Sequence, residues 1–132
     1  MTNLDVNGMS NLIARVNDYS LAAETENFLS TKHITLMADY SSSGVWDKDG
    51  FNLFLDILPI SVALKAAING WTDWYETNTD YDRSLPSTFQ TKAFSCVGYQ
   101  LALDIKRELP LWNIVYFDET TNTRADIGIM PL

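Results

Sequence analysis

The residues best suited to recognition chemistry lie between positions 71 and 82, where the sequence reads WTDWYETNTDYD. Two tryptophans and two tyrosines stand among four acidic residues, and no basic residue follows until Arg83. Aromatic rings beside carboxylates are typical of surfaces that bind lysine or arginine side chains. The same composition is also typical of a helix end and a loop that are simply solvated. Both interpretations fit the stretch.

Catalytic chemistry has little support in the sequence. His33 is the single histidine and Cys96 the single cysteine, and no pattern fixes either beside a third group, as a catalytic triad requires. Asp80 and Asp82 are paired acids, but on a polar loop they should be solvated. We therefore predict no enzyme and no catalytic residue. A small carboxylate-based hydrolase stays as an alternative, which would need two buried acids about 5–10 Å apart in a pocket.

Metal and cofactor motifs are also missing. Residues 47–50 (DKDG) resemble the opening of a calcium loop, but the glycine stands at the fourth place, and the twelfth position is Leu58 where glutamate is required. One histidine and one cysteine make a transition-metal site a poor interpretation, and no phosphate-binding or dinucleotide-binding glycine motif is present. We predict neither metal nor cofactor.

The charge balance narrows the choice of partner. Seventeen acidic against nine basic residues leave a formal charge of −8. Nucleic acid and anionic membrane normally require a basic patch, so both are poor partners, whereas a basic protein is a good one. A simpler interpretation is that the charge keeps a small protein soluble. No signal peptide is recognised, and the apolar run SVALKAAI is far shorter than the roughly 20 residues of a membrane span, so we predict a cytosolic protein.

The elements that position these residues follow from periodicity, because helical spacing of apolar residues predicts helices and alternation predicts strands. The predicted helices lie near 9–17 and at 20–31, 62–78 and 89–109, with a loop at 77–88. The predicted strands lie at 33–41, 51–57 and 112–117, with an edge strand or loose tail at 125–130. Asp49-Gly50 supplies a hairpin turn between the first two strands. This order predicts one α+β domain, 1–132, with a small antiparallel sheet of three to four strands and two main helices packed on one face.

The helix at 62–78 sets the orientation of the aromatic residues. Leu64, Ile68, Trp71 and Tyr75 recur at intervals of four, three and four, so they share one buried face. Gly70 costs about 1 kcal/mol relative to alanine in a helix, which favours a role in the close approach of a neighbouring backbone.

The residues beside that stripe are the candidates for partner contact. Trp74 should be half exposed, and Asp73 and Glu76 should face water. Partly exposed aromatic residues surrounded by charge are typical of interface hot spots. We therefore predict eight partner-binding residues, of which the last two are a second choice at the end of the strand at 112–117: Asp73, Trp74, Glu76, Asp80, Tyr81, Asp82, Asp118 and Glu119.

Three segments together resemble a known family. GVWDKDGFNL, LPISVALKAAINGWTDWYE and GYQLALDIKRELPLWNIVYFDE are similar to small bacterial immunity proteins of contact-dependent growth-inhibition systems, the CdiI type, over about residues 38–119. Seven positions match the pattern and are interpreted chiefly as fold determinants: Trp46, Asp47, Gly50, Trp71, Trp74, Tyr75 and Pro110. The resemblance implies a cytosolic inhibitor that binds the C-terminal toxin domain of its own system, often a basic nuclease. The alternative is an adaptor that binds another protein through the same surface.

Overall fold

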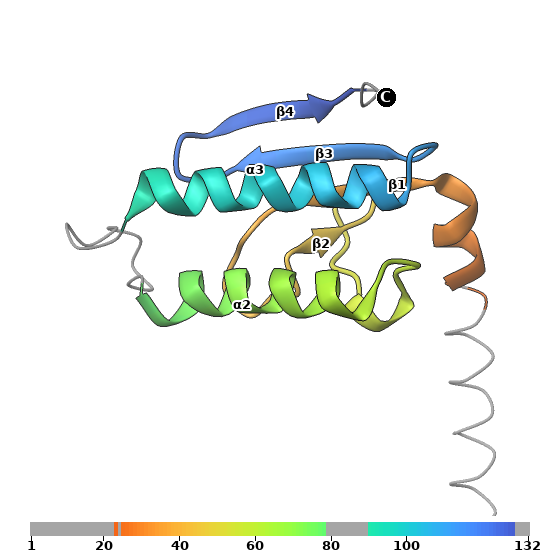
Figure 1. Cartoon of the computed structure of the whole chain (residues 1–132). Helices are drawn as coiled ribbons and strands as arrows, with labels where there is room; N and C mark the ends of the chain where they lie inside the picture. The colour runs from red at the N-terminus through yellow and green to blue at the C-terminus, as the bar shows by residue number, and fades with distance from the viewer. Residues whose placement is uncertain (1–22, 24, 79–89, 129–132) are drawn as a thin grey trace, which may run out of the picture. The chain divides into compact units, whose positions relative to one another are not determined.

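Over the residues that the structure describes, the sheet has four strands in the order β2-β1-β3-β4. The computed structural model describes residues 23, 25–78 and 90–128 (Figure 1). Two units are distinguished along the chain, 1–31 and 32–132. In the first unit residues 25–31 are helical, as predicted for the helix at 20–31. The sheet and both long helices belong to the second unit.

The sheet is mixed. Its strands have the following bounds: β1 His33–Leu36, β2 Val45–Trp46, β3 Asn113–Asp118 and β4 Thr123–Ile127. Strands β1 and β2 pair antiparallel, as do β3 and β4, whereas β1 and β3 pair parallel, with Ile34 opposite Ile114. The predicted α+β class and a mostly antiparallel sheet of four strands are confirmed, but the β1–β3 pair is parallel where antiparallel pairing was predicted, and β2 was not among the predicted strands. The parallel pair arises because a long helical crossover separates β1 from β3 and returns the chain to run in the same direction.

Two long helices cover one face of the sheet. Helix α2 (Val62–Asn78) and helix α3 (Thr91–Glu108) lie side by side and run antiparallel (Figure 1). The buried side chains of both helices pack against the buried side chains of the strands, and together they form the core. The largest fully buried side chains are Ile34, Leu36, Val45, Leu58, Ile68, Phe94, Ile105 and Ile114.

A turn does form at Asp49-Gly50, but it joins β2 to Asn52 and not the two predicted strands, and the strand predicted at 51–57 is wrong. Asp47 Oδ1 accepts the backbone N–H groups of Asp49 and Phe51, both at 2.9 Å, and Gly50 has a positive φ of 88°. After the turn only Asn52 pairs, in an isolated bridge with Trp46, and Leu55–Ile57 form the 3₁₀ helix η1. The Asn52 side chain donates to the carbonyl of Val45 at 3.0 Å, so a side chain takes the place of a longer backbone ladder.

The close approach expected at Gly70 occurs instead at Gly98. A Cβ on Gly70 would meet nothing within 4 Å, so that prediction is wrong. A Cβ on Gly98 would lie 2.5 Å from the Tyr116 hydroxyl oxygen and 2.6 Å from Cζ2 of Trp71. Gly98 therefore lets α3 settle onto β3 and α2 at once. Five groups of predicted positions lie outside the described residues: the helix near 9–17, residues 20–22 and 24 of the helix at 20–31, residues 79–88 of the loop, residue 89 of the helix at 89–109, and residues 129–130 of the edge strand.

Candidate functional site

Carboxylates gather where the parallel strands end. Parallel pairing brings the carboxyl ends of β1 and β3 to the same edge of the sheet, so Asp39, which follows β1, approaches Asp118 and Glu119 at the end of β3. Helix α2 also reaches this edge, and there the Tyr75 hydroxyl donates a hydrogen bond to Glu119 Oε2 at 3.0 Å. We call the acidic and aromatic residues at these ends of β1, β3 and α2, which lie at the left in Figure 1, the acidic edge: Asp39, Tyr40, Asp73, Trp74, Tyr75, Glu76, Asp118 and Glu119.

Glu119 has an asymmetric environment. Its Oε2 accepts the Tyr75 hydroxyl, but its Oε1 is buried and has no hydrogen-bond partner among the described residues. Burial raises the pKa of the Glu119 carboxyl group, and the negative charges of Asp39 and Asp118 add to that effect. The hydrogen bond from Tyr75 acts in the opposite direction, because it stabilises the ionised form.

Tyr75 links the core to this edge. Its side chain is only 5% exposed, and its ring centroid lies 5.0 Å from that of Tyr40 and 5.7 Å from that of Phe94. Burial, and then the adjacent Glu119 carboxylate, raise the pKa of the Tyr75 hydroxyl. The hydroxyl therefore keeps its proton at physiological pH and acts as a hydrogen-bond donor.

The α2 residues predicted to contact a partner have the expected orientation. Asp73 and Glu76 are exposed and Trp74 is half-buried, with its ring edge-on to Phe94 at a centroid distance of 5.2 Å. Glu76 Oε1 accepts the backbone N–H of Ser41 at 3.1 Å, and Ser41 has a positive φ of 55°. The segment after β1 thus fixes one of the exposed carboxylates.

Asp118 has a different environment from its neighbour. It is 9% exposed, and its Oδ1 accepts the backbone N–H of Thr120 at 3.0 Å and the Thr120 hydroxyl at 2.6 Å. These bonds order the turn into β4. Asp118 acts on the acidic edge mainly through its charge. The other predicted contacts, Asp80, Tyr81 and Asp82, lie outside the described residues.

Three members of the acidic edge, Asp39, Tyr40 and Tyr75, were not among the predicted contacts. Tyr75 was assigned to the core by its helical spacing, and its ring does lie there. A parallel pairing of β1 with β3 was the missing signal, because it alone places Asp39 beside Glu119. The remaining described carboxylates are spread over the other elements: Glu26, Asp47, Asp49, Asp56, Asp104, Glu108 and Asp126. The acidic edge is thus where carboxylates and aromatic rings coincide, while the charge surplus itself is distributed more widely.

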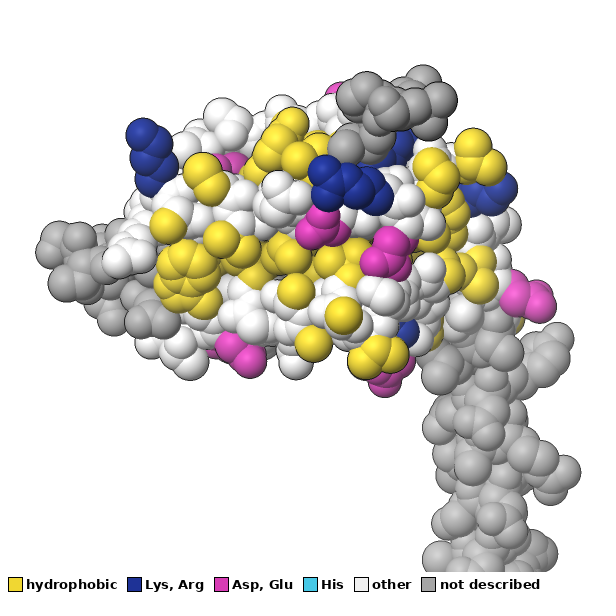
Figure 2. Space-filling model, viewed as in Figure 1, with side chains coloured by type: hydrophobic (Ala, Val, Ile, Leu, Met, Phe, Trp, Pro, Cys, Tyr) yellow, Lys and Arg dark blue, Asp and Glu magenta, His cyan; other side chains and the backbone are white. Residues whose placement is uncertain are grey.

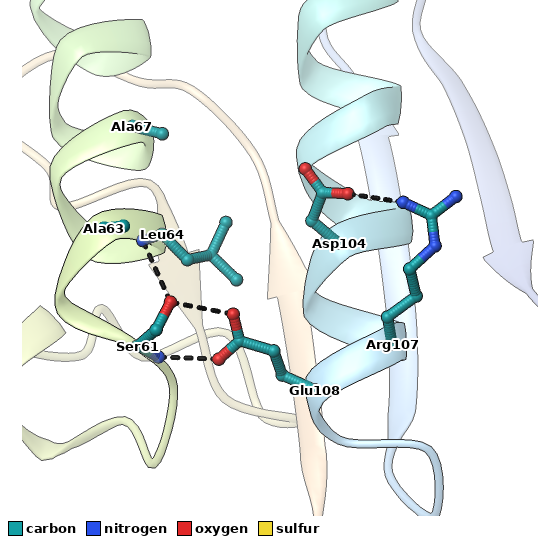
Figure 3. Close-up of a pocket in the computed structure, with 7 residues that line it drawn as sticks. All are labelled: Ser61, Ala63, Leu64, Ala67, Asp104, Arg107 and Glu108. Atoms are coloured by element: carbon teal, nitrogen blue, oxygen red, sulfur yellow. Dashed lines mark hydrogen bonds and ion pairs between the residues drawn. The ribbon is translucent and has the colours of Figure 1, made fainter.

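The outer face of the helices offers a second candidate. Figure 2 shows a row of hydrophobic side chains along the line between α2 and α3, with single acidic side chains beside the row and around it. A pocket of about 340 Å³ lies where α2 begins and α3 ends (Figure 3). Its lining combines small apolar and polar side chains: Ser61, Ala63, Leu64, Ala67, Asp104, Arg107 and Glu108.

The polar groups of this pocket hold the two helices together. The Ser61 hydroxyl accepts the backbone N–H of Leu64 at 3.2 Å and donates to Glu108 Oε2 at 2.8 Å, while the Ser61 N–H donates to Glu108 Oε1 at 2.6 Å (Figure 3). Glu108 therefore adds a negative charge to the N-terminus of α2, where the helix dipole favours one.

The same pocket does not meet the requirement of a carboxylate-based hydrolase. Its two acids are not buried: Glu108 is exposed, and the side chain of Asp104 is 37% exposed and ion-paired with Arg107 at 2.8 Å. Ser61 is committed to capping. Elsewhere, His33 is half-buried on β1 with its Nε2 3.2 Å from the Thr35 hydroxyl, and burial lowers its pKa.

Neither a metal site nor a membrane-spanning helix is found in the part of the chain that the structure describes. No group of three or more His, Cys, Asp or Glu side chains is arranged to hold a metal ion there. Among the described helices, none has both the length and the apolar character needed to cross a membrane.

The fold and this edge define a small α+β protein with two helices on one face of a mixed sheet and an acidic, aromatic edge. A family model described as Serratia CdiI immunity protein-like matches residues 32–119 of the 132. The chain belongs to this family, and the resemblance found over residues 38–119 is confirmed. Membership supports an immunity protein of a toxin system and implies a cognate toxin as partner. A search of the curated proteins found no match to the chain.

Proposed function

We propose that this chain binds the C-terminal toxin domain of its own system in the cytosol and neutralises it by forming a tight, non-catalytic complex. Membership of the CdiI immunity protein-like family is the observation that carries the proposal. The formal charge of −8 supports a basic toxin domain, for which a nuclease is the proposed activity, because a nuclease needs positive charge to hold its substrate.

The acidic edge is the proposed contact surface. Its exposed carboxylates, Asp73 and Glu76, would attract a basic domain and speed the encounter. Trp74 offers a half-buried ring that a partner side chain can cover, which is the chemistry of an anchor that slows dissociation. Glu119 supplies a third carboxylate, which the Tyr75 hydroxyl holds at the end of β3. Asp118 also belongs to the proposed surface, and Asp80, Tyr81 and Asp82, which follow α2 in the sequence, stay predicted contacts.

The proposed function is tested by protection and binding. The C-terminal domain of the protein encoded immediately upstream is expressed in a bacterial host with and without this chain. We expect growth arrest without the chain, growth with it, and a stable complex of the two purified proteins. If the chain neither binds nor protects, the proposal is refuted and an adaptor with another function is favoured.

The contact surface is tested by charge reversal. In the double variant Asp73→Lys and Glu76→Lys, association at low salt should slow by on the order of tenfold, and its dependence on salt should weaken. Asp56→Lys is the matched control, because it reverses an exposed acid on η1, before the opposite end of the 17-residue helix α2. Equal effects of the control and the double variant would refute the acidic edge as the interface.

A further inference from the structure

The acidic edge contains one carboxylate oxygen whose environment is incomplete. Glu119 Oε1 is buried and has no hydrogen-bond partner among the described residues, while Oε2 is held by the Tyr75 hydroxyl at 3.0 Å. A buried carboxylate oxygen without a donor is costly, and native proteins rarely leave one in that state. The residue as a whole is half-buried, so a partner can approach the exposed part of its side chain, and reaching Oε1 itself requires the partner to displace the atoms that cover it.

We infer that Tyr75 is a positioning residue of the toxin-binding surface: its hydroxyl holds the Glu119 carboxylate in place for a lysine or arginine side chain of the toxin domain. This inference rests on the proposed function. A cationic side chain would give the carboxylate a charge-assisted hydrogen bond and end the cost of its burial. An anchored carboxylate also loses less conformational entropy on binding than a mobile one.

The surroundings of Tyr75 fit a fixed donor. Its ring packs against Tyr40 and Phe94, and its backbone lies in α2, so the hydroxyl has little freedom to move away from Glu119. The charged groups that face Glu119 are Asp39, after β1, and Asp118, on its own strand, and both disfavour its ionised form. Tyr75 is the group that opposes them.

The test compares Tyr75→Phe with Tyr116→Phe. Tyr116 is a matched control, because its hydroxyl also leaves the same core to make a hydrogen bond, but to the Ser95 carbonyl at 3.1 Å and not to Glu119. Affinity is measured by calorimetry with the C-terminal domain of the protein encoded immediately upstream. We expect Tyr75→Phe to weaken binding by about two- to tenfold, the effect of one hydrogen bond, and Tyr116→Phe to leave it unchanged. In a Glu119→Gln background, Tyr75→Phe should have a smaller effect than in the wild type.

A second readout needs no toxin. Carbon-detected NMR follows the titration of the Glu119 carboxyl group in the free protein. Loss of the Tyr75 hydroxyl should raise the pKa of Glu119 further, and Tyr116→Phe should not. A purely packing role for Tyr75 would leave that pKa unchanged.

The outcomes separate the two proposals. If the wild-type chain fails to bind the toxin domain, the proposed function is refuted, and the partner contact of Glu119 with it. If the wild type binds but Tyr75→Phe binds equally well, or the pKa of Glu119 does not move in Tyr75→Phe, the positioning role alone is refuted.

Discussion

The same substitution at two glycines should have opposite effects on stability. Gly98 and Gly70 both lie inside long helices, so a change to alanine gains about 1 kcal/mol of helix propensity at either position. At Gly70 the new methyl group meets nothing within 4 Å, so Gly70→Ala should stabilise the protein by about that amount.

At Gly98 the new methyl group enters occupied space. It would lie 2.5 Å from the Tyr116 hydroxyl oxygen and 2.6 Å from Cζ2 of Trp71, distances that force a rearrangement. Neither neighbour moves freely. Trp71 is stacked on Phe94 at 4.8 Å and donates its Nε1 to the Phe94 carbonyl at 3.1 Å, and Tyr116 is bonded to the Ser95 carbonyl.

Overpacking of this kind costs about 1–3 kcal/mol, and loss of one of these hydrogen bonds adds about 1 kcal/mol. After the propensity gain, Gly98→Ala should destabilise the protein by about 1–3 kcal/mol, so the two variants should differ by about 2–4 kcal/mol. Urea unfolding followed by tryptophan fluorescence measures both free energies of unfolding. If Gly98→Ala is as stable as Gly70→Ala, the close packing of α3 on Tyr116 and Trp71 is not present in solution.

Three further predictions concern capping and pH. Ser61→Ala should lower the free energy of unfolding by about 1 kcal/mol, because α2 loses its N-cap. In the Ser61→Ala background, Glu108→Ala should lower the free energy of unfolding only slightly further, because Glu108 has already lost its bond to the Ser61 hydroxyl, and urea unfolding of the single and double variants measures this. The pKa of Glu119 is raised above its ordinary value of 4.5 in the folded state, so between these two values the folded state binds more protons than the unfolded state, and the free energy of unfolding falls as pH rises through that interval. Glu119→Gln should therefore be more stable than the wild type at pH 7 and lose that advantage below about pH 4.5. Urea unfolding of both proteins over this pH range measures the difference. Burial lowers the pKa of His33 below its ordinary value of 6.5 in the folded state, so the stability that neutral His33 contributes is present above pH 6.5 and is lost as pH falls through the pKa of the folded state. Proton NMR should place the titration midpoint of His33 in the folded protein below that in the unfolded chain.

The helices and the central strand could be predicted because their signals are local. The stripe of Leu64, Ile68, Trp71 and Tyr75 defines α2, whose bounds match the predicted 62–78, and all four residues are buried. The predicted strand at 112–117 matches β3 within one residue. The apolar stripe of α2 runs over several helical turns, and β3 is rich in aromatic and β-branched residues, so both elements could be assigned from local sequence.

The hairpin and the parallel pair could not be predicted in the same way. Alternation from Phe51 to Ile57 predicts a strand, but Phe51 and Phe54 are each 69% exposed, and after the single bridge at Asn52 the chain forms a 3₁₀ helix at Leu55–Ile57. A run of four or five alternating residues does not reveal whether a neighbouring strand is there to receive it. The pairing of β1 with β3 depends on how the two helices cross between them, which no short pattern encodes.

Only part of the acidic edge could be predicted from the sequence, because some of its contacts join residues far apart in the chain. Helix phase alone is enough to expose Asp73 and Glu76, but the bond between Tyr75 and Glu119 joins residues 44 positions apart. Tyr75 also belongs to the hydrophobic stripe, so the sequence predicted only a core position for it and not its hydrogen bond to Glu119. A buried tyrosine still has a hydroxyl that must find a partner, unlike leucine or phenylalanine at the same position. When such a tyrosine lies near the end of a core-facing helix, its acceptor is a candidate for the surface that the protein presents to others, and here that acceptor is a carboxylate with one oxygen still unmatched among the described residues.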